Sequence, residues 1–178
     1  NIGVLVSGGG SNLQAIIDNI NSDKLPGCRI VLVISSRQDA YALKRAEKNN
    51  IPAVCISRKN YSTIEEYDEA LITELEKRET DLVVMAGFLS IVGERFINRF
   101  QRRIMNVHPS LIPSFCGKGY YGLKPHEKAL EYGVKVTGAT VHFVELEPDA
   151  GPIILQKAVY IKDDDTPETL QKRVMEEA

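Results

Sequence analysis

Asn106 and His108 carry the clearest chemical signal in the sequence. Asn106 interrupts a short apolar run, Ile104–Val107, that is typical of a buried strand, and His108 follows this run directly. Residues two apart on a strand point to the same face, and Pro109 ends this strand because it has no N–H group to donate. The amide can donate a hydrogen bond to an oxyanion, and the imidazole can transfer a proton near neutral pH. The alternative is a turn-capping asparagine beside a hydrogen-bonded core histidine.

A glycine-rich loop, Ser7–Asn12, is the second candidate site. It follows the apolar run Ile2–Val6 and precedes Leu13–Ile17, whose apolar spacing is helical. Glycines let the backbone approach a ligand, and the N-terminal amides of a helix point toward an anion. Ser11 or Asn12 is expected to cap this helix. We therefore expect the loop to bind a phosphate group; the alternative is a tight turn that only needs glycine.

The composition favours one soluble globular domain. The chain has 178 residues, of which 43% are hydrophobic and 26% charged, and its net charge is −2. This charge gives no reason to expect a nucleic-acid or anionic-membrane surface. No apolar run approaches the ~20 residues of a membrane span, and no secretory signal is visible. The 3 cysteines form no C-x-x-C pair and the 3 histidines are widely spaced, which suits a cytoplasmic protein without a metal.

Apolar strands alternate with amphipathic helices along the chain. This alternation predicts an α/β fold, a doubly wound, mostly parallel open sheet with helices on both faces. We expect a single domain over residues 1–178, in a natural chain that continues further. The predicted strands are 2–6, 30–34, 52–56, 82–86, 104–108, 137–144 and 153–161, and the predicted helices are 13–17, 39–50, 62–77, 94–100, 126–131 and 166 onward.

The third predicted helix has the most complete local pattern. Ser62 with Glu65 is expected to form a capping box at its start. Four residues with helical spacing are expected to form its buried stripe: Tyr67, Leu71, Ile72 and Leu75.

Five ordered motifs are similar to those of one enzyme family. They are Ser7-Gly-Gly-Gly-Ser-Asn12, Met85-Ala-Gly-Phe88, Asn106-Val-His-Pro-Ser-Leu111, Gly138-Ala-Thr-Val-His142 and Asp149-Ala-Gly-Pro-Ile153. In this order, and over essentially its whole length, the sequence resembles the folate-dependent phosphoribosylglycinamide formyltransferases. The resemblance implies a Rossmann-like formyltransferase fold. It also implies that a formyl group passes from 10-formyltetrahydrofolate to the amino group of N1-(5-phosphoribosyl)glycinamide (glycinamide ribonucleotide) in de novo purine (IMP) biosynthesis.

The resemblance assigns roles to individual residues. Asn106, His108 and Asp149 match the catalytic triad: Asn106 would stabilise the oxyanion, and His108 would act as general acid and base. Asp149 would raise the pKa of His108. The substrate amine is the nucleophile, so neither a nucleophilic side chain nor a metal is needed. The phosphate-contacting positions would be Gly10, Ser11 and Asn12. The folate-binding positions would be Phe88, Leu89, Ser90, Ile91, Val92, Asn106, Glu145, Leu146, Glu147, Pro148 and Asp149.

Three features depart from the family pattern. Ile64 and Ser90 occupy positions where some relatives carry an arginine in the folate site, so the folate tail needs another partner. The loop Ser114–Leu123 is longer than in some relatives, and its Lys118 offers a cation near the substrate.

Other functions predict other features. A formyltetrahydrofolate hydrolase (deformylase) would use a similar triad with water as the nucleophile, and it is the closest alternative. A methionyl-tRNA formyltransferase would need a further RNA-binding domain and a basic surface. A catalytically inactive nucleotide- or sugar-phosphate-binding module would have vacant triad positions. An NAD oxidoreductase would carry an acidic ribose ligand where Ser35-Ser36-Arg37 stands. The sequence is compatible with a monomer or a homodimer.

Overall fold

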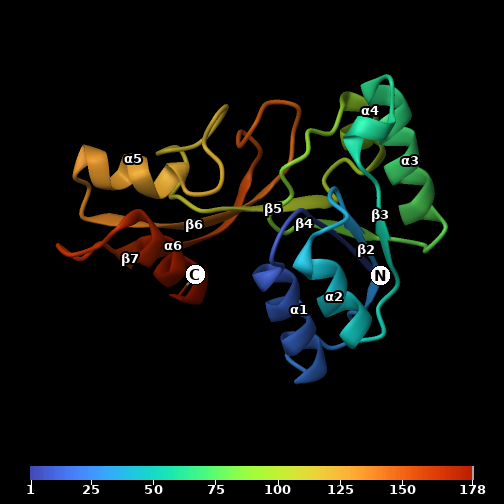
Figure 1. Ribbon diagram of the computed structural model, residues 1–178, viewed down its shortest axis with the longest axis horizontal. Coiled ribbons are helices and arrows are strands. Elements are labelled where there is room, and N and C mark those ends of the chain that lie inside the picture. The colour runs from blue at the N-terminus through green and yellow to red at the C-terminus, as the bar shows by residue number, and fades with distance from the viewer. Residues whose placement is uncertain (178) are drawn as a thin grey trace. The chain divides into compact units, whose positions relative to one another are not determined.

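The computed structural model describes residues 1–177 of the chain (Figure 1). The elements in chain order are β1 (Ile2–Val6), α1 (Ser11–Asn21), β2 (Ile30–Ser35), α2 (Tyr41–Lys48), β3 (Ala53–Cys55), a 3-10 turn (Arg58–Asn60), α3 (Ile64–Glu76), β4 (Leu82–Met85), α4 (Glu94–Arg99), β5 (Ile104–His108), α5 (Lys124–Tyr132), β6 (Val136–Phe143), β7 (Ile153–Tyr160) and α6 (Pro167–Glu177).

The strands form one sheet in the order β3-β2-β1-β4-β5-β6-β7. β1 pairs in parallel with β2 and β4, and β2 pairs in parallel with β3. β6 and β7 pair antiparallel, as expected for strands that follow each other without a helix between them. The prediction of a mostly parallel α/β sheet is therefore confirmed.

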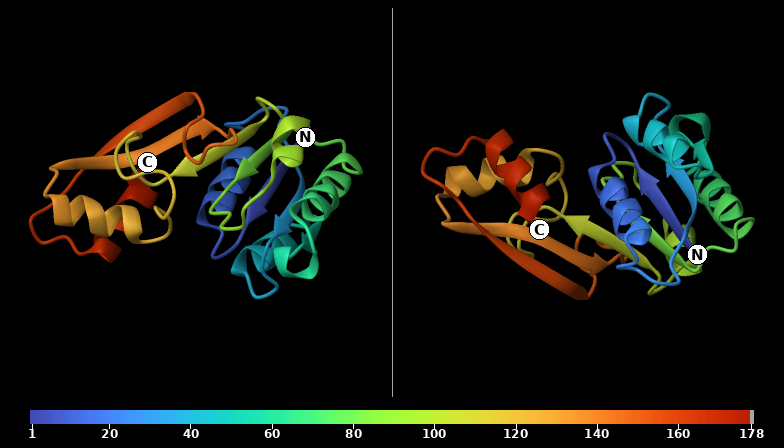
Figure 2. Two further views of the ribbon diagram at one scale, coloured as in Figure 1. Left: turned by 90° about the horizontal axis from the view of Figure 1, so that it is seen from above. Right: turned by 90° about the horizontal axis from the view of Figure 1, so that it is seen from below.

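The chain divides into two compact units, Asn1–Met105 and Asn106–Ala178. In the first unit, alternate residues of β1 face opposite sides of the sheet. Ile2, Val4 and Val6 pack in one core with α1 and α2. Gly3 faces α3, where an added Cβ would lie 2.4 Å from Leu75. Helices thus cover both faces of these strands, which the two views of Figure 2 show.

The start of α3 corrects the predicted capping box by one residue. Thr63, not Ser62, is the N-cap, and its side chain accepts a hydrogen bond from the Glu66 amide while the Glu66 carboxylate accepts from Thr63 N–H. Ser62 also donates its backbone N–H to Glu66, 2.9 Å away. Both capping boxes fit the local sequence, since Ser62 and Thr63 each have a glutamate three residues later. That stripe is confirmed, because all four predicted residues are buried.

The start of α1 also differs from the prediction. Gly10 is the N-cap in the left-handed conformation, with φ 72°, and no side chain caps the helix. Ser11 and Asn12 instead begin the first helical turn. A residue with a Cβ would be strained at this φ, and its Cβ would lie 2.7 Å from that of Ala42. The third glycine of the loop is therefore required by the fold itself.

The second unit has its own small core. Ala139 of β6 and Val159 of β7 pack against Leu170 and Val174 of α6. α5 begins at Lys124, two residues before the prediction, because Pro125 fits the first turn of a helix. Among residues 1–177, no helix is both long and apolar enough to cross a membrane.

Candidate active site

His108 ends β5 as a buried side chain with an acceptor at each ring nitrogen. Its Nε2 lies 2.9 Å from the carbonyl oxygen of Phe115, and its Nδ1 lies 3.4 Å from Oδ2 of Asp149. A carbonyl can only accept, so Nε2 carries a proton. The second contact is favourable when Nδ1 carries one too. The His108 ring therefore lies between a carbonyl and a carboxylate, two groups that can only accept a hydrogen bond.

Asp149 lies in the turn between β6 and β7, with φ 56°. Its Oδ2 accepts a hydrogen bond of 2.8 Å from the Gly117 amide. Burial raises the pKa of the Asp149 carboxyl, but the Gly117 amide and the His108 ring are among the groups that lower it below its ordinary value. Asp149 is therefore a carboxylate at neutral pH, held between the loop after β5 and two histidines.

Asn106, two residues before His108 on β5, contacts a second histidine. Its Nδ2 lies 3.2 Å from Nε2 of His142, a buried residue of β6. His142 Nδ1 lies 2.9 Å from the carbonyl oxygen of Phe143, and its Nε2 lies 3.6 Å from Oδ1 of Asp149. The three predicted triad residues therefore lie close together: His142 contacts Asn106 and Asp149, and Asp149 contacts His108. The sequence placed His142 on a strand and in a family motif but gave it no role of its own.

The loop after β5 is anchored by Thr140, a fully buried residue of β6. The Thr140 hydroxyl donates to the Ser110 carbonyl over 2.7 Å and accepts from Ile112 N–H over 3.1 Å. Ser110 in turn donates its hydroxyl to the Ser114 carbonyl. These bonds fix the turn that carries the Phe115 carbonyl to His108.

The glycine loop after β1 binds through its carbonyls to α2. The Gly8 carbonyl accepts from the Ala42 amide over 3.0 Å, and the Gly9 carbonyl accepts from Arg45 Nε over 2.8 Å. Among residues 1–177, no group accepts a hydrogen bond from the backbone N–H of Gly10, Ser11 or Asn12. Free amides at the start of an 11-residue helix have the geometry that suits an anion.

The segment Phe88–Val92, one of the two predicted folate-binding segments, forms neither helix nor strand. Leu89 N–H donates to the Ser7 hydroxyl over 2.8 Å, and Ser7 also bonds the Ser36 hydroxyl over 2.6 Å. The segment ends at Gly93, whose amide donates to the buried carboxylate of Asp68 over 2.8 Å.

Asp68 also accepts from the Phe96 amide over 3.1 Å, so this α3 side chain caps α4. The sequence pattern identified Ser7 only as part of the glycine loop and did not single out Asp68, because their partners lie 82 and 25 residues away along the chain. The second predicted folate-binding segment, Glu145–Asp149, is also irregular, and its residues Glu145 to Pro148 are exposed.

Comparison with known proteins assigns the chain to a family. The formyl transferase family matches residues 1–178. The chain belongs to the formyl transferase family. It is 42% identical over 176 residues to phosphoribosylglycinamide formyltransferase of Haemophilus influenzae, which covers 99% of this chain and 80% of that protein. It is 44% identical over 173 residues to the human trifunctional purine biosynthetic protein adenosine-3, but it spans only 16% of that protein's length.

Solved structures of family members agree with this fold. Glycinamide ribonucleotide transformylase 1 from Symbiobacterium toebii superposes with a TM-score of 0.92 at 44% identity, covering 99% of this chain and 80% of that one. A formyltetrahydrofolate deformylase from Pseudomonas syringae superposes with a TM-score of 0.86 at 28% identity, covering 99% of this chain and 56% of that one.

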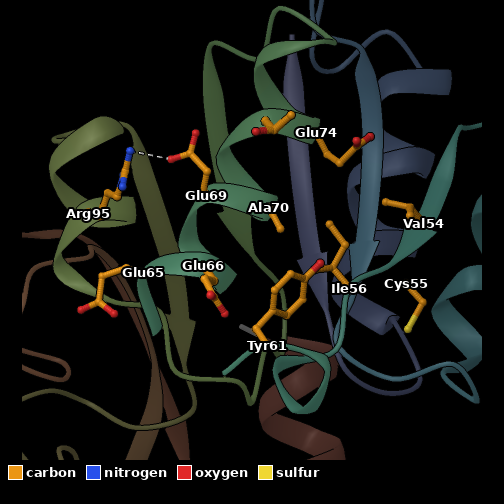
Figure 3. Close-up of a pocket in the computed structure, with 11 residues that line it drawn as sticks. Val54, Cys55, Ile56, Tyr61, Glu65, Glu66, Glu69, Ala70, Glu74 and Arg95 are labelled. Atoms are coloured by element: carbon orange, nitrogen blue, oxygen red, sulfur yellow. Dashed lines mark ion pairs between the residues drawn. The ribbon is translucent and has the colours of Figure 1, made fainter. Parts of the chain in front are cut away.

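One surface recess of the first unit holds none of the predicted site residues. It has a volume of about 770 Å³ and lies along α3 and β3 (Figure 3). Four glutamates line it, and one of them, Glu69, pairs with Arg95 over 2.8 Å. Its acidic lining does not suit a phosphate or a folate carboxylate, so we place no formyl transfer chemistry there.

Proposed function

We propose that this protein transfers a formyl group from 10-formyltetrahydrofolate to the amino group of glycinamide ribonucleotide, a step of purine synthesis. The observation that carries the proposal is the Asp149–His108 contact of 3.4 Å, made beside Asn106 in a chain of the formyl transferase family. The identity of 42% with the Haemophilus influenzae enzyme over 176 residues supports the same substrates.

The reaction needs one nucleophile, one oxyanion stabiliser and one proton carrier. The substrate amine attacks the formyl carbon, so a C–N bond forms and the carbonyl oxygen becomes an oxyanion. Asn106 donates a hydrogen bond to that oxygen, and the Nε2–H of protonated His108 turns to it from the Phe115 carbonyl. The bond from the formyl carbon to the folate nitrogen then breaks. The folate nitrogen takes up one proton from His108, and the substrate amine returns one proton to the ring. Asp149 favours the protonated ring.

In this proposal, backbone amides and irregular segments bind the two substrates. The free amides of Gly10, Ser11 and Asn12 and the Ser11 and Asn12 side chains hold the substrate 5′-phosphate. Phe88–Val92 and Glu145–Asp149 read the pterin ring of the folate through irregular backbone. A folate analogue should protect both segments from hydrogen exchange. Protection confined to the Ser7–Asn12 loop would contradict this assignment.

A direct assay tests the proposal and its closest alternative. The purified protein is mixed with 10-formyltetrahydrofolate, with and without glycinamide ribonucleotide. The proposal predicts that folate is consumed only with the ribonucleotide present, with one formylated product per folate. Equal consumption without the ribonucleotide would identify a hydrolase, in agreement with the structural likeness to the Pseudomonas syringae deformylase.

A further inference from the structure

His142 has three polar neighbours and no role in the chemistry proposed above. It is 2% exposed, so each ring nitrogen must be satisfied by the groups around it. Those groups are the Phe143 carbonyl at Nδ1, and Asn106 Nδ2 and Asp149 Oδ1 at Nε2.

The partners fix where the ring proton lies. The Phe143 carbonyl can only accept, so Nδ1 carries a proton. Asn106 Nδ2 can only donate, so at 3.2 Å it needs a lone pair on Nε2. The Asp149 oxygen, 3.6 Å from Nε2, is beyond ordinary hydrogen-bond length. The contacts therefore match a ring whose Nδ1 donates and whose Nε2 accepts.

We propose that His142 is a positioning residue that fixes the orientation of the Asn106 amide by accepting one of its two N–H groups. The amide then presents its second N–H, and not its oxygen, for the oxyanion. An Asn106 amide turned by 180° would bring an oxygen to Nε2 and remove the donor from its place. The structural claim stands on its own; its catalytic consequence rests on the formyl transfer proposed above.

Nitrogen NMR of the protein without substrates tests the structural claim. The ¹⁵N shifts of His142 should show a protonated Nδ1 and an unprotonated Nε2. A scalar coupling across the hydrogen bond should join Nε2 to the Asn106 side-chain amide. A ring that is protonated on Nε2 near neutral pH would overturn the proposal, because the Asn106 amide would then have to face it with its oxygen.

Substitutions test the catalytic consequence. His142→Phe keeps a ring but removes the acceptor, so kcat should fall by about 10- to 100-fold through misplacement of Asn106. Both KM values should change little. His142→Gln restores an acceptor oxygen and should recover part of kcat and of the Asn106 amide shift. If His142→Phe fails to fold, His142→Gln and the NMR of the unmodified protein still decide the claim.

His126 provides the matched control. It is a fully buried histidine of the same unit, and neither of its nitrogens has a hydrogen-bond partner among residues 1–177. His126→Phe should leave the Asn106 amide resonances in place. A folded His142→Phe variant with the Asn106 resonances and kcat of the unmodified protein would refute the positioning role. If even the unmodified protein transfers no formyl group, the proposed function fails, while the NMR result still decides the orientation of the amide.

Discussion

The ends of β1 and β5 both lie in the sheet, yet they present different chemical groups. After β1, the loop presents backbone N–H groups, and its carbonyls are held by α2. At the end of β5, the functional groups are the side chains of Asn106 and His108, and each is oriented by another side chain or by a carbonyl. The first arrangement suits a ligand of fixed charge, and the second suits a charge that appears and disappears during a reaction.

The two loops should therefore fail in different ways. A backbone site tolerates a change of side chain but not a Cβ where the chain has a positive φ. A side-chain site tolerates small movements of the backbone but not the loss of a donor or a charge. The predictions below use this difference, beginning with the largest expected effect.

Replacing Asn106 removes a donor from the side-chain site. Asn106→Ala should lower kcat by about 10²–10³-fold, as is typical for one oxyanion donor. The KM for the ribonucleotide should change little, because the phosphate is bound elsewhere. Steady-state kinetics with each substrate varied in turn will measure this. A change in KM with kcat intact would remove Asn106 from the chemistry.

The pH dependence of stability should come from the second unit and not from the glycine loop. Ser7–Asn12 contains no titratable side chain, whereas α5 buries His126. Burial, with a contribution from the charge of His108, lowers the pKa of His126 to about 4. Between pH 6.5 and 4 the unfolded chain binds a proton that the folded chain does not. The free energy of unfolding should therefore fall by about 3 kcal/mol as the pH drops through this window.

Urea unfolding from about pH 7 to about pH 4 will measure this loss. His126→Phe should flatten the curve, while His126 in the unmodified protein should remain neutral in the folded state at about pH 6. An unchanged pH slope in the folded variant would mean that other groups cause the loss.

Adding a side chain at Gly10 tests the backbone site. Gly10→Val places a Cβ at φ 72° and close to Ala42, a strain of about 1–3 kcal/mol. The loop must shift, so the KM for the ribonucleotide should rise by about tenfold while the KM for the folate changes much less. Gly27→Val is the matched control, because Gly27 has φ 75° with open space around it. Equal effects of Gly10→Val on both KM values would count against the assignment.

Replacing Asp68 should have a smaller effect than the changes at Asn106, His126 and Gly10. Asp68→Asn keeps the shape but weakens the cap on Gly93 and Phe96, so the segment Phe88–Val92 loses its anchor. We expect the KM for the formyl donor to rise by about fivefold, less than the full value of a charge-assisted hydrogen bond. Asp18→Asn, at an exposed position of α1, serves as control. A rise in the ribonucleotide KM instead would reverse the assignment.

Local patterns predicted most of the fold and the two main site segments. The strand period placed Asn106 and His108 on one face, and the glycine loop indicated a helix N-terminus. The pattern could not choose between Ser62 and Thr63 as the cap of α3, because either residue fits a capping box. It also could not find His142 or Asp68, since their roles depend on which strands and helices become neighbours. Such contacts are set by tertiary packing.

Asp149→Asn tests the separation of binding from chemistry most directly. Asn adopts φ 56° as readily as Asp, so the turn keeps its shape while the charge beside His108 disappears. The transfer rate and the dissociation constant of the ribonucleotide are measured on the same sample. We expect kcat to fall by about 10²-fold or more, the value of a proton carrier, while the dissociation constant stays within about twofold. A folded variant with near-normal kcat, or one whose ribonucleotide affinity falls as far as its rate, would contradict the account.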